Sequence, residues 1–258
     1  MIGNKIKKIL NKISGSLLYL LYPHACPFCG RVLEHEEKDI CGECEPLIPR
    51  ISGPVCLKCG KEIIDMEAEL CVDCKRLLRS YVRGFPALNY VAPLKESIGQ
   101  FKYHNKKEYA AFFASEIIRA HGKNILDVSP DVLVPVPLHK KKMQRRGYNQ
   151  AAVLAKELSR KLGIPVDENI IERCVNTLPQ KMLSGDEREN NIKKAFLSCK
   201  KCVEYKSVML VDDIYTTGAT IEACTRLLHD MGVKDVFYTS ISIGRGIDLY
   251  GIKELPKL

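Results

Sequence analysis

Eight of the twelve cysteines in this chain of 258 residues form four Cys-x-x-Cys pairs, which dictate the local fold of the amino-terminal third. Two intervening residues let both sulfurs of a pair face one ion, and two pairs complete a tetrahedral zinc site. Four cysteines leave the ion no open position, so its expected role is structural. The sequence therefore predicts two structural zinc ions, held by Cys26, Cys29, Cys41, Cys44, Cys56, Cys59, Cys71 and Cys74.

The four pairs recur every 15 residues, but the residues beside them follow a period of 30. Gly30 and Gly60 follow the first and third pairs, whereas Glu45 and Lys75 follow the second and fourth. This alternation indicates two copies of one unit. It favours sequential grouping, in which each zinc site combines neighbouring pairs. A cross-brace, which combines the first pair with the third and the second with the fourth, stays open because the spacing is equal.

Two other uses of paired cysteines fit the sequence less well. Disulfides would require a secreted protein, and the apolar run at residues 17–22 is too short for an export signal and lacks an Ala-x-Ala site. A redox motif would be a single pair beside a βαβ unit. Thiols kept for metal imply a reducing compartment, so we predict a cytoplasmic protein. No apolar stretch is long enough to span a bilayer.

The first residues carry a helical pattern, because Ile2, Ile6, Ile9, Ile13 and Leu17 fall on one face. We expect this amphipathic helix to pack on the body of the protein. The alternative is a surface helix that binds a membrane or a partner, which would make the protein peripheral at the membrane.

Residues 208–220 combine a strand, two acids, a loop and a helix. Residues 208–211 read as a strand buried on both faces, and Asp212 and Asp213 end it. Apolar residues at helical spacing follow over 221–231. Loop amides and a helix amino terminus bind anions, and paired acids accept hydrogen bonds from sugar hydroxyls or hold Mg²⁺ through water. The predicted loop residues are Thr216, Thr217, Gly218, Ala219 and Thr220.

A second strand, loop and helix span residues 131–162. Its loop carries five cations within seven residues, which suits either a solvated basic loop or a clamp for pyrophosphate. We favour the clamp, because a phosphorylated sugar with two anionic ends needs two anion sites. The candidates are Lys140, Lys142, Arg146 and Gly147.

Length and composition suit one domain and a small module. We predict a helix over 1–24, a zinc module over 25–78 and a domain over 79–258. Within that domain we expect a strand at 88–91, helices at 95–103 and 108–121, a mobile lid within 170–200, and a strand at 235–243 beside 208–211. The formal charge of +9 falls to about +5 if eight thiolates hold two Zn²⁺, so net charge alone is a weak argument for nucleic-acid binding.

The stretch at 208–220 resembles the phosphoribosyl pyrophosphate (PRPP) signature of type I phosphoribosyltransferases. Together with the cysteine pairs, residues 135–138 and the Arg-Gly-Tyr-Asn-Gln segment at 146–150, the chain resembles the ComF family of bacterial competence and DNA uptake. Ala219 stands where many relatives have glycine, and lysines precede Arg146 where relatives often carry arginine.

The resemblance implies a type I phosphoribosyltransferase fold, a twisted parallel sheet with helices on both faces, after a double zinc ribbon. It also implies Mg²⁺-dependent displacement of pyrophosphate from PRPP. Asp212 and Asp213 would hold the ribose hydroxyls, the loop at 216–220 would bind the 5′-phosphate, and Arg146 and Gly147, with Lys140 or Lys142, would hold pyrophosphate and Mg²⁺.

Two functions from different classes remain open in the sequence. One is a working phosphoribosyltransferase of unidentified acceptor. The other is a nucleic-acid-binding accessory in DNA uptake, which would use the fold as a platform for single-stranded DNA and for proteins of the uptake machinery.

Overall fold

The computed structural model describes residues 24–34, 39–173, 196–198 and 204–244. It contains two compact units, residues 1–48 and 49–258. The predicted amino-terminal helix and residues 174–195 of the predicted lid lie outside the described residues. The domain boundaries at 24/25 and 78/79 stay predictions. No helix in the described part of the chain is long and apolar enough to cross a membrane.

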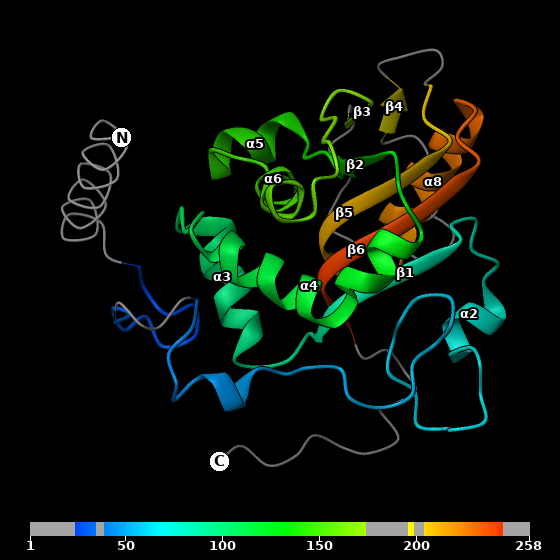
Figure 1. Cartoon of the computed structure of the whole chain (residues 1–258). Helices are drawn as coiled ribbons and strands as arrows, with labels where there is room; N and C mark the ends of the chain where they lie inside the picture. Colours follow the sequence, from blue (N-terminus) through cyan, green and yellow to red (C-terminus); the bar gives the residue numbers. More distant parts are fainter. Residues whose placement is uncertain (1–23, 35–38, 174–195, 199–203, 245–258) are drawn as a thin grey trace, which may run out of the picture. The chain divides into compact units, whose positions relative to one another are not determined.

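The larger unit is built on a four-stranded sheet in which all neighbouring strands run parallel (Figure 1). Its order is β1-β6-β5-β2. Buried apolar runs explain the two inner strands, and the predicted pairing of 235–243 with 208–211 is confirmed. The strands are β1 (Arg83–Asn89), β6 (Asp235–Ile243), β5 (Ser207–Tyr215) and β2 (Val132–Pro135).

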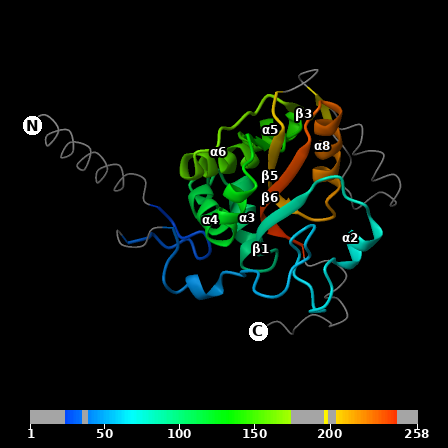
Figure 2. The same ribbon diagram turned by 45° about the vertical axis from the view of Figure 1, so that its right-hand side comes forward.

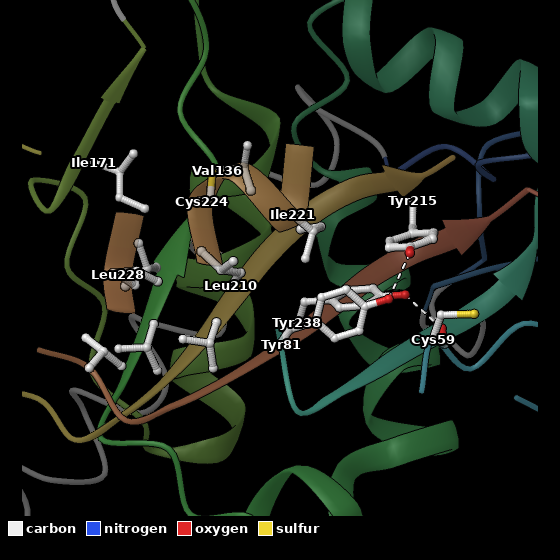
Figure 3. Close-up of a cluster of buried hydrophobic side chains, with 14 of the residues drawn as sticks. Cys59, Tyr81, Val136, Ile171, Leu210, Tyr215, Ile221, Cys224, Leu228 and Tyr238 are labelled. Atoms are coloured by element: carbon white, nitrogen blue, oxygen red, sulfur yellow. Dashed lines mark hydrogen bonds between the residues drawn. The ribbon is translucent and has the colours of Figure 1, made fainter. Parts of the chain in front are cut away.

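Helices cover both faces of this sheet (Figures 1 and 2). Helices α4 (Tyr109–Asp127) and α6 (Gln150–Leu162) pack together on one face, and α8 (Ala219–Asp230) packs on the other. Side chains alternate between the faces along a strand, so Val208 and Leu210 join Leu228 of α8 in one apolar cluster (Figure 3). The predicted parallel sheet with helices on both faces is confirmed.

Smaller elements complete the described chain. They are η1 (Glu45–Leu47), α2 (Val72–Arg76), α3 (Leu94–Tyr103), α5 (Lys140–Arg146), β3 (Ile171–Arg173) and β4 (Phe196–Ser198). Strands β3 and β4 pair antiparallel at the two ends of the segment predicted as a lid.

Three elements differ from the sequence prediction. Strand β5 continues through both acids to Tyr215, because the ladder with β6 extends that far. Strand β1 lies at 83–89, earlier than the predicted 88–91, since it is an edge strand that accommodates Pro86. The cation segment is the helix α5 and not a loop: His139 caps its start, and Gly147 ends it in the left-handed conformation.

Candidate functional site

A cavity of about 660 Å³ lies where the chain leaves strands β2 and β5. After β2 the chain forms α5 and then α6, and α6 packs on one face of the sheet. After β5 it forms α8, which packs on the other face. Adjacent parallel strands whose connections diverge in this way leave a crevice at their carboxyl ends, the usual ligand site of such sheets. The topology therefore predicts a binding site where the cavity is found.

The cavity has a strong excess of positive charge. Six basic side chains and two carboxylates line it, which leaves four more positive than negative charges. This balance suits a polyanionic ligand. The charged lining residues are Lys102, Lys141, Lys142, Arg145, Arg146, Arg173, Asp212 and Asp213.

The two acids have different environments although they are neighbours in the sequence. Asp213 forms an ion pair with Lys102 of α3, with 2.9 Å between Oδ1 and Nζ. Asp212 accepts a hydrogen bond from the Asp213 amide at 2.8 Å. Burial, and then the charge of Asp213, raise the pKa of Asp212 to about 7. The pKa of Asp212 thus lies near neutral pH, where this carboxyl exchanges a proton readily beside the ion pair of Asp213 and Lys102.

Residues 216–220, called here the threonine loop, join β5 to the amino terminus of α8. Gly218 caps the helix with a φ of 77°, a left-handed conformation that favours glycine. Thr216 and Thr220 line the cavity. Among the described residues, the amide of Gly218 donates no hydrogen bond to the protein. Two threonines thus line the cavity beside the amino terminus of α8, a position that favours a bound anion.

Helix α5 also contributes to the wall of the cavity. Arg146 donates hydrogen bonds to Gln150 Oε1 at 2.9 Å and to the Tyr103 hydroxyl at 3.1 Å, and its guanidinium lies over the Tyr103 ring. Burial and the charges of Arg173 and Arg146 lower the pKa of Lys142. Crowded cations of this kind gain from an anion that relieves their repulsion.

The segment at 146–150 also explains how distant elements meet at the cavity. Asn149 accepts from the Ala151 amide at the start of α6 and donates to the Val136 carbonyl at 3.0 Å. The Tyr148 hydroxyl donates to the carbonyl of Phe101 on α3. These contacts hold α3, and with it Lys102, beside the end of β2.

The structure brings together part of the predicted set. Asp212, Asp213, Thr216, Thr220, Arg146 and Lys142 line the cavity. Thr217, Gly218, Ala219 and Gly147 are not lining residues but shape the backbone beside it, and Lys140 instead pairs with Glu172 at 3.4 Å. Sequence reasoning about the site missed Lys102, Lys141, Arg145, Asn149 and Arg173. The basic run and the Arg-Gly-Tyr-Asn-Gln segment contained a signal for three of them, whereas Lys102 and Arg173 come from other elements.

The eight paired cysteines form two groups of four, and the grouping is sequential. In each group the four sulfurs lie within 4.8 Å of one another, and the sulfurs of Cys29 and Cys41, like those of Cys59 and Cys71, are 3.7 Å apart. A tetrahedral ion with 2.3 Å bonds to sulfur requires about 3.8 Å between sulfurs. The donor set therefore fits structural zinc.

The backbone confirms the predicted 30-residue repeat. In the first copy, residues 24–48, the Cys26 amide donates to Arg31 at 2.7 Å, and in the second copy, residues 54–75, the Cys56 amide donates to Lys61 at the same distance. Gly30 and Gly60 have φ of 75° and 73°. The first copy belongs to the smaller unit and the second to the larger one.

Comparison with known proteins supports the assignment of the zinc module and of the domain that follows it. Residues 17–75 match the family described as a double zinc ribbon domain, and residues 145–246 match the phosphoribosyl transferase domain. Competence protein F of Haemophilus influenzae is 36% identical over 154 residues, which cover 57% of this chain and 67% of that protein. The chain belongs to the ComF family.

Other ComF relatives extend the comparison. Competence protein ComFC of Bacillus subtilis is 29% identical over 86% of this chain and 75% of its own length. DNA utilization protein YhgH of Escherichia coli is 33% identical over 57% of this chain and 66% of its own length. The chain thus spans about two thirds of the first curated relatives that it matches. A purine phosphoribosyltransferase from Pyrococcus horikoshii overlaps 57% of this chain and 93% of its own at 18% identity and a TM-score of 0.30, too low to bear on the fold.

Proposed function

We propose that this ComF protein binds PRPP together with Mg²⁺ in the cavity between β2 and β5 and transfers the phosphoribosyl group with release of pyrophosphate. The observation that carries the proposal is that one cavity is lined by an acid pair, by threonines of the threonine loop and by the cations of α5. A sugar phosphorylated at both ends offers matching groups, because it has phosphates for the loop and the cations and hydroxyls for the acids.

The residues suit distinct roles in such a reaction. Amides and hydroxyls of the threonine loop would hold the 5′-phosphate, and Arg146 and Lys142 would hold the pyrophosphate as its bond to the anomeric carbon breaks. Asp212 and Asp213 would accept hydrogen bonds from the ribose hydroxyls and offset the positive charge that develops on the ring. Mg²⁺, when bound with PRPP, would neutralise phosphate charge. The acceptor forms the new bond to the anomeric carbon and loses its proton.

Lys102 interacts with one of the two acids before the ligand binds. It pairs with Asp213 in the ligand-free protein, and both side chains are mostly buried, with 16% and 14% exposed. A ribose hydroxyl or a hydrated cation that approaches Asp213 must share that carboxylate with Lys102. Lys102 therefore keeps the acid pair ordered before the ligand arrives and limits the repulsion between its two carboxylates.

Calorimetric titration of PRPP, with and without Mg²⁺, tests the proposal. The wild-type protein should bind PRPP more tightly with Mg²⁺, and a variant with both Asp212→Asn and Asp213→Asn should lose that gain. Release of pyrophosphate during incubation with candidate acceptors then tests turnover. Absence of PRPP binding by a folded, zinc-loaded protein would refute the proposal.

The names of the relatives favour a second role in DNA handling. Curated relatives are called competence protein F and DNA utilization protein. Arg145, which lines the cavity, lies over the ring of Tyr103, which is 53% exposed. On this basis we place the protein in DNA uptake, where single-stranded DNA or a protein of the uptake machinery would be its partner. Binding of single-stranded DNA should weaken steeply with salt. A flat salt response would exclude it.

A further inference from the structure

The segment that follows the second copy makes contacts with the threonine loop and α8 that the proposed function does not use. The guanidinium of Arg79, four residues after the copy ends, donates from Nη2 to the carbonyl oxygen of Thr217 at 2.7 Å. The next residue, Ser80, donates from its amide and its hydroxyl to the carboxylate of Glu222, at 2.9 and 2.7 Å. The segment that follows the cysteines is thus fixed to the loop and to the first turn of α8.

Three buried tyrosines, Tyr81, Tyr215 and Tyr238, form a second connection, called here the tyrosine cluster (Figure 3). The Tyr238 hydroxyl donates to the carbonyl of Cys59 at 2.7 Å, and its ring stacks on Tyr215 with centroids 4.7 Å apart. The hydroxyls of Tyr81 and Tyr215 are 2.8 Å apart. Burial raises the pKa of all three phenols, so they remain neutral hydrogen-bonding groups.

The tyrosine cluster ends directly beneath the threonine loop. A Cβ atom added at Gly218 would overlap the hydroxyl and ring of Tyr215. The loop backbone therefore rests on that ring, and the ring is positioned by Tyr238, which is hydrogen-bonded to the backbone of a cysteine in the second Cys₄ group. Close packing transmits a displacement at one end of such a stack to the other.

The Arg79 contact sets the direction of a loop amide. A trans peptide is planar, and its C=O and N–H point in opposite directions. Because the Thr217 carbonyl points at Arg79, the Gly218 amide of the same peptide points away from it. A rotation of this peptide would redirect that donor and would leave the half-buried guanidinium without this acceptor.

We propose that Arg79 and Tyr81 are positioning residues for the threonine loop, and that zinc in the second copy thereby controls the affinity of the cavity for a sugar 5′-phosphate. This inference rests on the proposed function, because it names what organises one half of that site. It also gives the second copy a role that the first copy, with the same cysteine geometry in a separate unit, does not share.

The first test compares Arg79→Met with Arg76→Met, which removes the same charge from an exposed position three residues earlier. Affinities are measured in the full chain for ribose 5-phosphate, which needs the loop, and for inorganic pyrophosphate, which needs α5. We expect Arg79→Met to weaken ribose 5-phosphate binding by about ten-fold or more and to leave pyrophosphate binding within about two-fold. Arg79→Lys should recover part of the loss. A general loss of structure would weaken both ligands and would contradict the proposal.

The second test observes the metal itself. Cobalt(II) is loaded into a Cys29→Ser variant, in which only the second group keeps four thiolates, and into Cys59→Ser, in which only the first does. Addition of ribose 5-phosphate should change the cobalt absorption of the former and not of the latter. If Cys59→Ser does not fold, the test relies on the cobalt absorption of Cys29→Ser, measured with and without the additional substitution Tyr81→Phe. An unchanged spectrum in Cys29→Ser would refute the coupling.

Hydrogen exchange separates failure of this inference from failure of the proposed function. The amides of residues 216–220 should exchange faster in Arg79→Met than in wild type or Arg76→Met without any ligand. If wild type binds neither PRPP nor ribose 5-phosphate, the proposed function fails while this measurement still tests the positioning. Equal exchange rates in the three proteins would refute it.

Discussion

The raised pKa of Asp212 predicts that one substitution stabilises the ligand-free protein while it abolishes ligand binding. Burial and the charge of Asp213 raise this pKa from 3.8 to about 7. Between these pH values the folded protein binds more protons than the unfolded chain, so the free energy of unfolding falls as pH rises. The full effect is about 4 kcal/mol at 1.36 kcal/mol per pKa unit, and contact with solvent in the cavity reduces it to about 2 kcal/mol.

Asp212→Asn keeps the shape of the side chain and the acceptor for the Asp213 amide but cannot ionise. We expect it to raise the free energy of unfolding by about 2 kcal/mol at pH 8 and by only about 0.5 kcal/mol at pH 4.5. Urea unfolding followed by far-UV circular dichroism measures both. Saturating PRPP with Mg²⁺, at a hundred times its dissociation constant, should stabilise wild type by about 2.7 kcal/mol and Asp212→Asn far less.

Asp213→Asn is the matched control, because it lies one residue away and has the opposite expectation. Loss of its 2.9 Å ion pair removes the direct partner of the mostly buried Lys102, so this variant should be less stable than wild type at pH 8 by about 1–3 kcal/mol. The reasoning is refuted if Asp212→Asn unfolds at lower urea than wild type at pH 8, or if its gain is the same at pH 4.5.

Three further outcomes follow from the structure. Gly218→Ala should lose about 2–4 kcal/mol of stability in urea unfolding. Gly147→Ala, with a similar φ but open space at Cβ, should lose about 1 kcal/mol. Equal losses would show that the Tyr215 ring does not contact Gly218. Lys142→Met should weaken pyrophosphate binding about ten-fold by calorimetry, and Lys140→Met should weaken it less than about two-fold. A larger loss in Lys140→Met would show that pyrophosphate does not bind beside Lys142. Elemental analysis should find two zinc ions per chain, and a cysteine-to-serine variant in either group should lose one.

The part of the site that could be predicted from sequence is the part that is local in the chain. Asp212, Asp213 and the threonine loop follow one another, so the order of strand, acids, loop and helix is visible in a short window. Lys102 and Arg173 reach the cavity only because α3 and β3 fold next to β5. Neither has a periodicity or spacing that marks it, since tertiary packing alone brings it to the acids.

The zinc module shows the same limit. The 30-residue alternation predicted two copies and the sequential grouping, because it follows from a repeated local turn. The place of the second copy in the larger core could not be predicted in this way. It depends on the match of Cys59 with Tyr238 and of Gly60 with Pro86, pairs of residues from distant segments. The sequence therefore predicted which cysteines form each zinc site, but not which distant residues pack against the second copy.

The tyrosine cluster also equips this protein with an internal optical reporter. The chain contains no tryptophan, so its near-ultraviolet absorption and emission come mainly from its eleven tyrosines. Two of them, Tyr215 and Tyr238, stack with their rings almost parallel, 8° between their planes, and the Tyr215 ring lies directly beneath the threonine loop. Events at the cavity can therefore be followed by the intrinsic signal of the unlabelled protein.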